Sequence, residues 1–319
     1  MLSDEREEHF VTLFDRNFLA AGLCLYRSLE RHATPFVLWV VCMDEIVETR
    51  LRELALPRMR LLPLAEVETG DLKRVRGGRT VGEYCWTITP FIPQFVLDQE
   101  PSVRRVTYLD ADLYFFADPR RLLQELDAAG AGVLITPHAY SPEYDLSTVS
   151  GIYCVQFITF RNSAEARRIM RWWQERCIEW CYSRAEDGKF GDQKYLDDWP
   201  QRFAGTVHVL QHPELALGPW NANRFLRDAG TLPVFFHFHG LRVVSEGRLL
   251  LYMEYRLTRE AARLYDQYVP EFTSALRDCH ARWGDVSAAA APLGLLERLR
   301  RLRLRLKGAI RYAEYRIEP

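Results

Sequence analysis

The feature that most constrains the fold is an unbroken run of apolar residues at positions 36–43. Such a run, without the alternation of a half-exposed strand, is typical of a β-strand that is covered on both faces. Positions 17–31 and 44–54 have the spacing of amphipathic helices, and the apolar segments at 9–14 and 59–63 have the character of strands. Strands that alternate with helices indicate a helix-covered parallel sheet, so the opening of the chain predicts an α/β fold.

The same pattern continues to about residue 280. Polar and glycine-rich residues at 70–82 predict a loop, and Pro90 and Pro93 interrupt a helical pattern at 83–97. The further expected elements are strands at 106–109, 131–137, 151–160, 207–210 and 234–238, a short helix after Pro119, and helices at 164–182 and 258–279. We predict one α/β domain over residues 1–280 and a C-terminal tail over 281–319.

The tail interleaves leucine with arginine at positions 295–307. On a helix, one stripe would carry Leu295, Leu299, Leu302 and Leu306, with Arg298, Arg301 and Arg305 away from it. This pattern predicts a basic amphipathic helix, which suits an anionic membrane surface. A helix that docks on the domain or on a partner, with a solvated charged face, explains the pattern equally well.

The net charge of the 319 residues is −1, which provides no overall field for nucleic acid. The seven cysteines are an odd number and lack the spacing of a disulfide framework. The acidic first eight residues have no apolar core like that of a secretory signal, and no stretch of 18 apolar residues occurs. A reducing, cytoplasmic setting is therefore expected, with association at the inner face of the membrane if the tail binds lipid.

Two carboxylates, Asp110 and Asp112, follow the apolar segment 106–109. Side chains at i and i+2 of a strand point the same way, and two unpaired negative charges there would repel each other. A divalent cation with oxygen ligands relieves this repulsion and keeps open positions for phosphate oxygens. An Asp-x-Asp in a solvated turn is the ordinary alternative, but the apolar flanks favour a functional pair.

Two later segments supply further polar groups. An apolar strand at 234–238 contains His237 and is followed by His239, Gly240 and Arg242. A neutral imidazole from this segment could ligate a Mn²⁺-type ion beside two carboxylates. Core or surface histidines are the alternative for this strand. Asp192 and Gln193 open a helical stretch after a glycine turn, where Asp192 could also serve only as an N-cap.

Taken in their order along the chain, these segments resemble glycosyltransferase family 8, the type that includes glycogenin and bacterial lipopolysaccharide galactosyltransferases. The resemblance covers residues 9–245. Segments 11–18 and 22–29 resemble that family's opening strand and nucleotide-contacting loop, and Asp110-Ala111-Asp112 resembles its metal motif.

Two further blocks complete the resemblance. Asp192-Gln193 resembles the pair at the start of the family's sugar-binding helix, and His237 begins a His-x-x-Gly block whose first histidine is the third metal ligand. Segments 190–200, 219–221 and 235–242 are similar to an uncharacterised bacterial branch of such enzymes.

The resemblance implies the GT-A nucleotide-diphospho-sugar transferase fold, with a mostly parallel mixed sheet covered by helices. It implies a hexosyltransferase that moves a sugar from a nucleoside diphosphate sugar, UDP-hexose foremost, to a hydroxyl, with retention, in bacterial glycan or glycoconjugate synthesis. The acceptor would be a glycan, a lipid-linked molecule or a small molecule.

The resemblance also assigns residues. Asp110, Asp112 and His237 would hold Mn²⁺ or Mg²⁺, and Asp192 and Gln193 would be catalytic. The nucleotide-sugar-binding residues would be Thr12, Asp15, Asn17, Asp110, Ala111, Asp112, Gln156, Asn221, Gly240 and Arg242.

The chain departs from the family at three positions. Cys154 and Gln156 stand where the family has Asn and Gly, beside the donor sugar and the acceptor. Val243 stands where the family has a phosphate-binding Lys, a role that Arg242 could take because arginine binds phosphate in a bidentate way. These departures leave open the alternative of a non-catalytic subunit that binds nucleotide sugars or takes part in assembly.

Two other enzyme classes fit less well. A sugar nucleotidylyltransferase needs a glycine-rich phosphate loop after the first strand, and positions 13–16 contain no glycine. An aspartyl phosphatase would carry its Asp-x-Asp early in the chain with a threonine two residues later, whereas here the pair is central and Tyr114 takes that place.

Overall fold

The computed structural model describes residues 7–228, 232–245, 247–284, 302–303 and 310–314. Its centre is a seven-stranded sheet in the order β3-β2-β1-β4-β7-β6-β8. The strands are β1 (Glu8–Phe14), β2 (Phe36–Cys42), β3 (Met59–Pro63), β4 (Arg105–Leu109), β6 (Val133–Pro137), β7 (Tyr153–Arg161) and β8 (Val207–Val209). All pairs are parallel except those of β7, which runs antiparallel to both β4 and β6. The sheet is therefore mostly parallel and mixed, as predicted.

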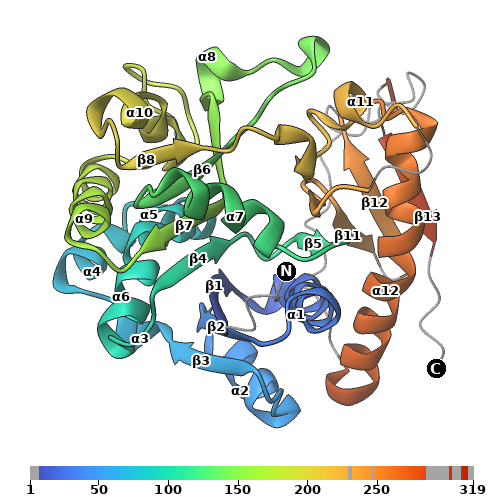
Figure 1. Ribbon diagram of the computed structural model, residues 1–319. Helices are drawn as coiled ribbons and strands as arrows, with labels where there is room; N and C mark the ends of the chain where they lie inside the picture. Colours follow the sequence, from blue (N-terminus) through green and yellow to red (C-terminus); the bar gives the residue numbers. More distant parts are fainter. Residues whose placement is uncertain (1–6, 229–231, 246, 285–301, 304–309, 315–319) are drawn as a thin grey trace.

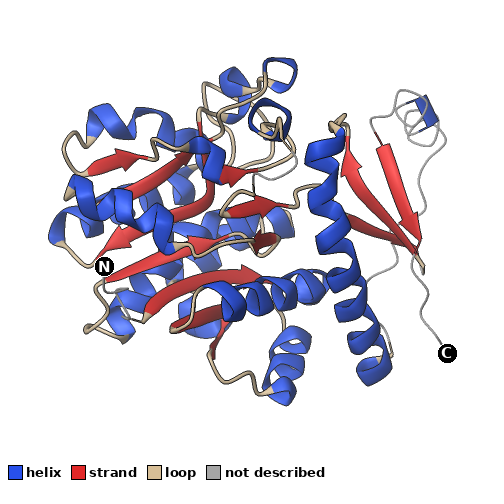
Figure 2. Ribbon diagram, turned by 45° about the vertical axis from the view of Figure 1, so that its right-hand side comes forward, coloured by secondary structure: helices blue, strands red, loops and turns tan. Residues whose placement is uncertain are grey.

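Helices cover both faces of this sheet (Figures 1 and 2). Strand side chains alternate between two apolar cores: Phe10 and Leu38 belong to one, and Val11 and Trp39 to the other. The first core is closed by α1 (Leu19–His32), α2 (Glu45–Leu54), α7 (Arg120–Ala129) and α12 (Arg259–Trp283). The second is closed by α3 (Leu64–Val67), α4 (Gly70–Arg76), α5 (Val81–Ile88), α6 (Ile92–Gln99), α9 (Ala164–Glu179) and α10 (Trp199–Arg202).

Two small sheets extend the central one. The first has the order β5-β10-β9, from β5 (Leu113–Phe115), β9 (Ala216–Leu217) and β10 (Phe235–His237). The second is antiparallel, from β11 (Arg242–Ser245), β12 (Arg248–Met253) and β13 (Ile310–Glu314). Helix α12 lies between this sheet and the body of the molecule (Figure 2), and the rings of Tyr252 and Tyr265 meet there edge to face at 5.3 Å.

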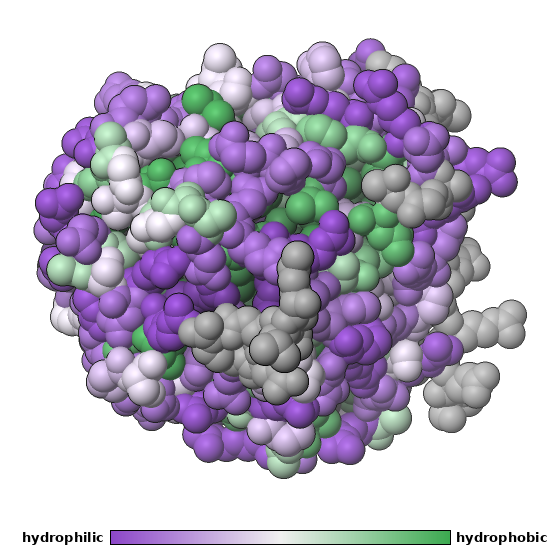
Figure 3. All heavy atoms as spheres, in the orientation of Figure 1, coloured by the Kyte–Doolittle hydropathy of each residue, from purple (hydrophilic) through white to green (hydrophobic). Residues whose placement is uncertain are grey.

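Short helical segments make up most of the remaining described structure. They are η1 (Arg16–Phe18), η2 (Thr89–Phe91), η3 (Pro142–Tyr144), α8 (Ser147–Ser150), η4 (Gln193–Asp198), η5 (Pro213–Leu215) and α11 (Ala222–Phe225). Hydrophilic residues cover most of the face seen in Figure 3, with hydrophobic residues gathered in patches. No helix within the described ranges has the length and apolar character needed to cross a membrane.

Two sequence expectations need correction or extension. The predicted loop at 70–82 is wrong, because Thr69 caps α4 and Thr80 caps α5 in a capping box with Glu83, while Leu72 of α4 is fully buried. In the tail, α12 continues through Trp283, past the expected boundary at 280, and residues 310–314 form strand β13 rather than helix. The predicted amphipathic helix at 295–307 falls outside the described residues except for 302–303, which are helical.

Candidate active site

The site begins where β4 ends, because Asp110 and Asp112 occupy the turn that joins β4 to β5. The Asp110 amide donates to the Gln156 carbonyl at 3.0 Å, and the Asp112 carbonyl accepts from the Phe238 amide at 2.9 Å. The turn is therefore tied on one side to β7 and on the other to the residue after β10. These backbone bonds fix both carboxylates at the carboxyl end of the central sheet.

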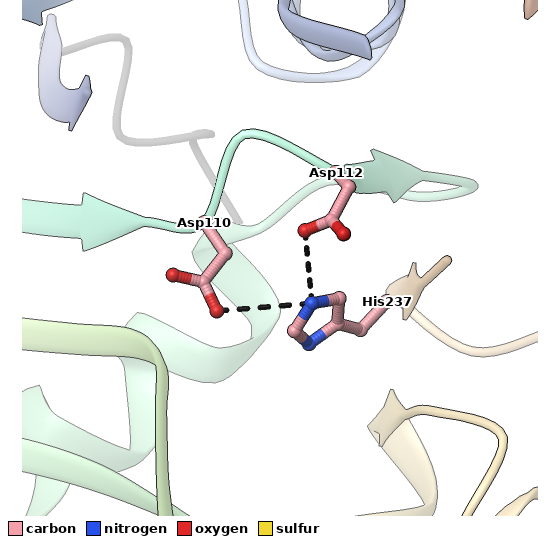
Figure 4. A group of neighbouring side chains, drawn as sticks. All are labelled: Asp110, Asp112 and His237. Carbon is pink, nitrogen blue, oxygen red and sulfur yellow. Dashed lines mark ion pairs between the residues drawn. The ribbon is translucent and has the colours of Figure 1, made fainter. Parts of the chain in front are cut away.

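His237, the last residue of β10, faces both carboxylates (Figure 4). It lies opposite Leu113 in the antiparallel pair of β10 and β5, which brings it to the same turn. Its Nε2 atom is 2.9 Å from Oδ1 of Asp112 and 3.7 Å from Oδ2 of Asp110. The three ligand atoms all lie within 4.8 Å of one another. The structure thus brings together the three residues that the sequence predicts as metal ligands.

Charge is concentrated at this point, on two half-buried carboxylates and a buried imidazole. Burial alone would suppress ionisation, but the charge of His237 and its hydrogen bond lower the pKa of Asp112. Burial would lower the pKa of His237, but the charge of Asp112 and its hydrogen bond raise this pKa well above its ordinary value. Burial and the nearby Asp112 raise the pKa of Asp110, although His237 opposes this. Without a cation, the cluster therefore depends on a proton held by His237.

The donor set fits a hard or borderline divalent cation. Two carboxylates and one imidazole are ligands that Mn²⁺ accepts, and carboxylates suit Mg²⁺. Asp110 is also positioned by Tyr108, whose hydroxyl donates to its Oδ1 at 2.8 Å. Tyr108 lies two residues earlier, near the end of β4, so the alternation of side chains along the strand was the signal that could have identified it.

Two cavities meet at the triad. The β1 cavity, about 380 Å³, is lined by Leu13, Phe14, Asp15, Phe18, Val81, Gly82, Cys85, Trp86, Thr89, Tyr108, Asp110, Ala111, Asp112, His237, His239 and Arg242. The η4 cavity, about 300 Å³, is lined by Trp86, Asp110, His138, Tyr140, Leu146, Ser150, Cys154, Phe190, Gly191, Asp192, Gln193, Trp220, His237, His239 and Tyr255. Trp86, Asp110, His237 and His239 belong to both, so the cavities share a wall that contains two of the three triad residues.

Most of the predicted site residues reach one of these cavities. Asp15, Ala111 and Arg242 line the β1 cavity with the carboxylate pair, and Asp192 and Gln193 line the η4 cavity. Arg242 is exposed, and its guanidinium carbon lies 5.3 Å from the centre of the Phe18 ring. A permanent cation and an aromatic ring thus lie together at the β1 cavity.

Five predicted contacts lie outside both linings. Thr12 is fully buried in β1, and Asn17 donates from its side chain to Asp15 at 2.9 Å. Asn221 is fully buried and uses its amide to donate to the His138 carbonyl at 2.9 Å and to accept from the Gly218 amide at 2.9 Å. These bonds give the side chains of Asn17 and Asn221 structural partners.

The remaining two of these positions are Gln156 and Gly240. Gln156 is also fully buried and lines neither cavity. Gly240, another predicted contact outside both linings, has φ of +85°, which favours glycine at the turn after β10. For Thr12, Asn17, Gln156, Asn221 and Gly240, a direct contact with nucleotide sugar stays a prediction.

Asp192 is the buried acid of the η4 cavity. Burial, together with the charge of Asp110, raises the pKa of its carboxyl well above the ordinary value. Gly191 before it has φ of +53°, and a Cβ there would lie 3.3 Å from Cε3 of Trp86. The positive φ and the close approach of Trp86 both favour glycine at this position.

Several further residues of the η4 cavity were not among the predicted site residues. They are aromatic or imidazole side chains from α5 and from separate loops: Trp86, His138, Tyr140, Phe190, Trp220 and Tyr255. His138 stacks on Tyr140 with ring centres 4.6 Å apart, and burial lowers the pKa of His138 to about 3. Flat aromatic surfaces of this kind bind ligands with apolar faces and a few polar edges. Their convergence depends on tertiary structure and could not be read from spacing.

Comparison with known proteins identifies the fold of the chain. No protein-family model matches the chain. The galactosyltransferase LgtC, solved in complex with donor and acceptor sugar analogues, has a TM-score of 0.52 at 13% identity, covering 84% of this chain and 96% of LgtC. The glycosyltransferase GlyE of Streptococcus pneumoniae has a TM-score of 0.52 at 15% identity, covering 90% of this chain and 66% of GlyE. These similarities confirm the predicted GT-A fold.

Two proteins found by sequence have a higher identity to the chain than these solved structures. The chain is 28% identical over 274 residues to the uncharacterized protein YfnD of Bacillus subtilis, covering 82% of this chain and 87% of YfnD. It is 31% identical over 250 residues to the uncharacterized protein YfnF of the same organism, covering 74% of this chain and 82% of YfnF. With this identity over most of both chains, and with the GT-A fold, the protein belongs to the family of Bacillus subtilis YfnF.

Proposed function

We propose that the protein is a metal-dependent glycosyltransferase that moves a sugar from a nucleoside diphosphate sugar to a hydroxyl acceptor. The observation that carries this proposal is the position of the Asp110, Asp112 and His237 triad at the junction of two cavities. A diphosphate links a nucleoside to a sugar, so a cation site between two cavities matches the chemistry of such a donor. The GT-A fold shared with LgtC and GlyE supports the same reading.

The β1 cavity is the proposed nucleoside side. Asp15 and Phe18 lie at the end of β1, where an aromatic ring and a carboxylate suit a base and a ribose hydroxyl. Arg242 supplies a permanent positive charge at the same cavity, and bidentate hydrogen bonds to a phosphate group fit its guanidinium. A divalent cation bound by the triad would add positive charge where the diphosphate leaving group becomes more negative.

The η4 cavity is the proposed side for the transferred sugar and the acceptor. Asp192 and Gln193 offer a buried carboxyl and an amide to sugar hydroxyls, while Trp86 and Phe190 provide apolar surface, their ring centres 6.3 Å apart. In this proposal the ionised form of Asp192 stabilises positive charge at the anomeric carbon. Burial and the charge of Asp110 oppose that ionisation, and a cation at the triad would offset the charge of Asp110. From the resemblance to family 8, we infer a UDP-hexose donor, a bacterial glycan or glycoconjugate acceptor, and retention of configuration by attack on the same face of the sugar.

We also infer a cytoplasmic site of action, with peripheral attachment to the inner face of the membrane. The support is the leucine and arginine pattern at 295–307. The anionic surface of that membrane would attract such a helix.

The test is a panel of nucleoside diphosphate sugars, incubated with and without Mn²⁺ and with acceptor extracts, with sugar transfer followed directly. Asp112→Asn should abolish turnover and weaken Mn²⁺-dependent UDP binding, because it removes an anionic ligand. Asp266→Asn, on the exposed face of α12, is the matched control. Full turnover by Asp112→Asn would refute the metal assignment. Binding of a nucleotide sugar without turnover on any acceptor would favour the non-catalytic subunit.

A further inference from the structure

Gln156 of β7 contacts two of the three triad residues. Its backbone carbonyl accepts the Asp110 amide at 3.0 Å, and its side-chain Oε1 lies 2.9 Å from Nδ1 of His237. The side chain is fully buried and lines neither cavity. Cys154, two residues earlier in β7, does line the η4 cavity. The cavity lining in β7 thus ends before Gln156, whose side chain contacts His237 instead.

The chemistry of this hydrogen bond sets the state of the imidazole. An amide oxygen can only accept, so Nδ1 of His237 must carry the hydrogen. In the neutral ring, the lone pair then resides on Nε2, and Nε2 is the atom that faces Asp112 at 2.9 Å and Asp110 at 3.7 Å. A metal-ligating histidine needs this arrangement, with its other nitrogen hydrogen-bonded to a fixed acceptor.

We propose that Gln156 is a positioning residue of the metal centre: its side chain fixes the tautomer and ring orientation of His237, and its backbone fixes Asp110. This inference rests on the proposed function, because it assigns Gln156 to the cation site of that proposal. It replaces a direct contact between Gln156 and the sugar, since a fully buried side chain outside both cavities offers no surface to a ligand.

The second polar atom of the Gln156 side chain supports the same reading. Its Nε2 is buried and has no hydrogen-bond partner among the described residues. An unsatisfied buried N–H group is costly, so packing alone would favour an apolar side chain of similar length here. The hydrogen bond from His237 is the interaction that an apolar side chain would lose.

The experiment measures binding of Mn²⁺ alone, without nucleotide, from the electron paramagnetic resonance signal of the free ion. Gln156→Met keeps the length of the side chain but removes the acceptor, and it should weaken Mn²⁺ binding about 10- to 100-fold. Gln156→Glu restores an acceptor and should recover the affinity. Thr159→Val is the matched control: it removes a buried hydroxyl of the same strand, bonded to Thr107 at 2.9 Å, and should leave Mn²⁺ binding unchanged.

A second readout needs no variant and so does not depend on how a substituted protein folds. With Zn²⁺, a diamagnetic ion that takes imidazole ligands, ¹⁵N NMR of labelled histidine should show His237 with a protonated Nδ1 and a metal-bound Nε2. A protonated Nε2 would overturn the proposal.

The outcomes separate the two proposals. If the wild-type protein binds Mn²⁺ and folded Gln156→Met binds it equally well, the role of Gln156 is refuted while the metal centre stands. If the wild-type protein binds no Mn²⁺ either alone or with UDP, the metal centre of the proposed function is refuted, and the role of Gln156 with it.

Discussion

Nε2 of His237 lies 2.9 Å from Oδ1 of Asp112, so a proton on His237 and a cation at the triad compete for the same carboxylate. Asp112 has a lowered pKa and stays ionised at neutral pH, because the charge and hydrogen bond of His237 outweigh its burial. The pKa of His237 is raised by this partner. A cation that binds Nε2 must therefore displace a proton that the fold itself stabilises.

Mn²⁺ affinity should consequently rise with pH. Below the raised pKa of His237 each binding event should release about one proton, and above it none. Calorimetric titration in two buffers with different heats of ionisation measures this number. In the metal-free protein, the His237 contribution to stability is fully present below the ordinary histidine pKa and is lost as pH rises through the raised value. A Mn²⁺ affinity that does not change with pH would contradict the coupling.

Arg242 provides the second prediction, because it is an exposed cation on the wall of the β1 cavity. Arg242→Ala should weaken UDP binding about tenfold, the loss expected for a charge-assisted hydrogen bond. Uridine carries no phosphate, so its affinity should hardly change and serves as the internal control. Calorimetry with both ligands at two salt concentrations measures the difference. An equal loss for UDP and uridine would place Arg242 at the base instead.

Asp192 provides the third prediction, because it lines the η4 cavity but not the β1 cavity. Asp192→Ala should lower turnover about 100-fold or more, the scale for loss of one preorganised electrostatic group. UDP affinity should stay close to that of the wild type, because the nucleoside side is untouched. Steady-state kinetics beside UDP titration make the comparison. A loss of UDP affinity with turnover preserved would reverse the assignment of the two cavities.

The sheet could be predicted from local apolar patterns, and the triad from the family resemblance. The apolar run at 36–43 became β2 (Phe36–Cys42), fully buried along its length, and the segment at 59–63 became β3. Asp110, Asp112 and His237 were identified as a set through the family resemblance, and the antiparallel pair of β10 with β5 brings them together. Spacing alone could not have specified that pairing, because Leu113 and His237 lie 124 positions apart in the sequence.

Other parts of the site follow from tertiary contacts. Trp86 lies in both cavities, yet α5 begins inside a segment whose glycines predicted a loop. The capping box of Thr80 and Glu83 overrode that composition, which shows how capping can outweigh glycine content. For Gln156, its position in the family resemblance suggested a sugar contact, whereas its burial and its bond to His237 depend on the position of a distant strand.

The last prediction concerns Lys194 and Asp197 of η4, which bind the segment 146–152 at the wall of the η4 cavity. Lys194 donates to the Ser147 carbonyl at 2.8 Å and pairs with Asp197 at 2.8 Å, while Asp197 accepts from the Ile152 amide at 2.7 Å. Both side chains are largely shielded from solvent. Because these bonds span two segments and are partly buried, each contributes more than a surface pair.

Asp197→Ala should therefore destabilise the protein by about 1–3 kcal/mol, since it leaves Lys194 and the Ile152 amide without this partner. Asp198→Ala is the matched control, because the neighbouring Asp198 forms an exposed pair with Arg202, and its loss should cost no more than about 1 kcal/mol. Denaturant unfolding of both variants measures the difference. In kinetics, Asp197→Ala should raise KM for the acceptor more than KM for the donor, because the segment borders the η4 cavity through Leu146 and Ser150. Equal destabilisation by the two variants would show that these bonds do not fix the wall.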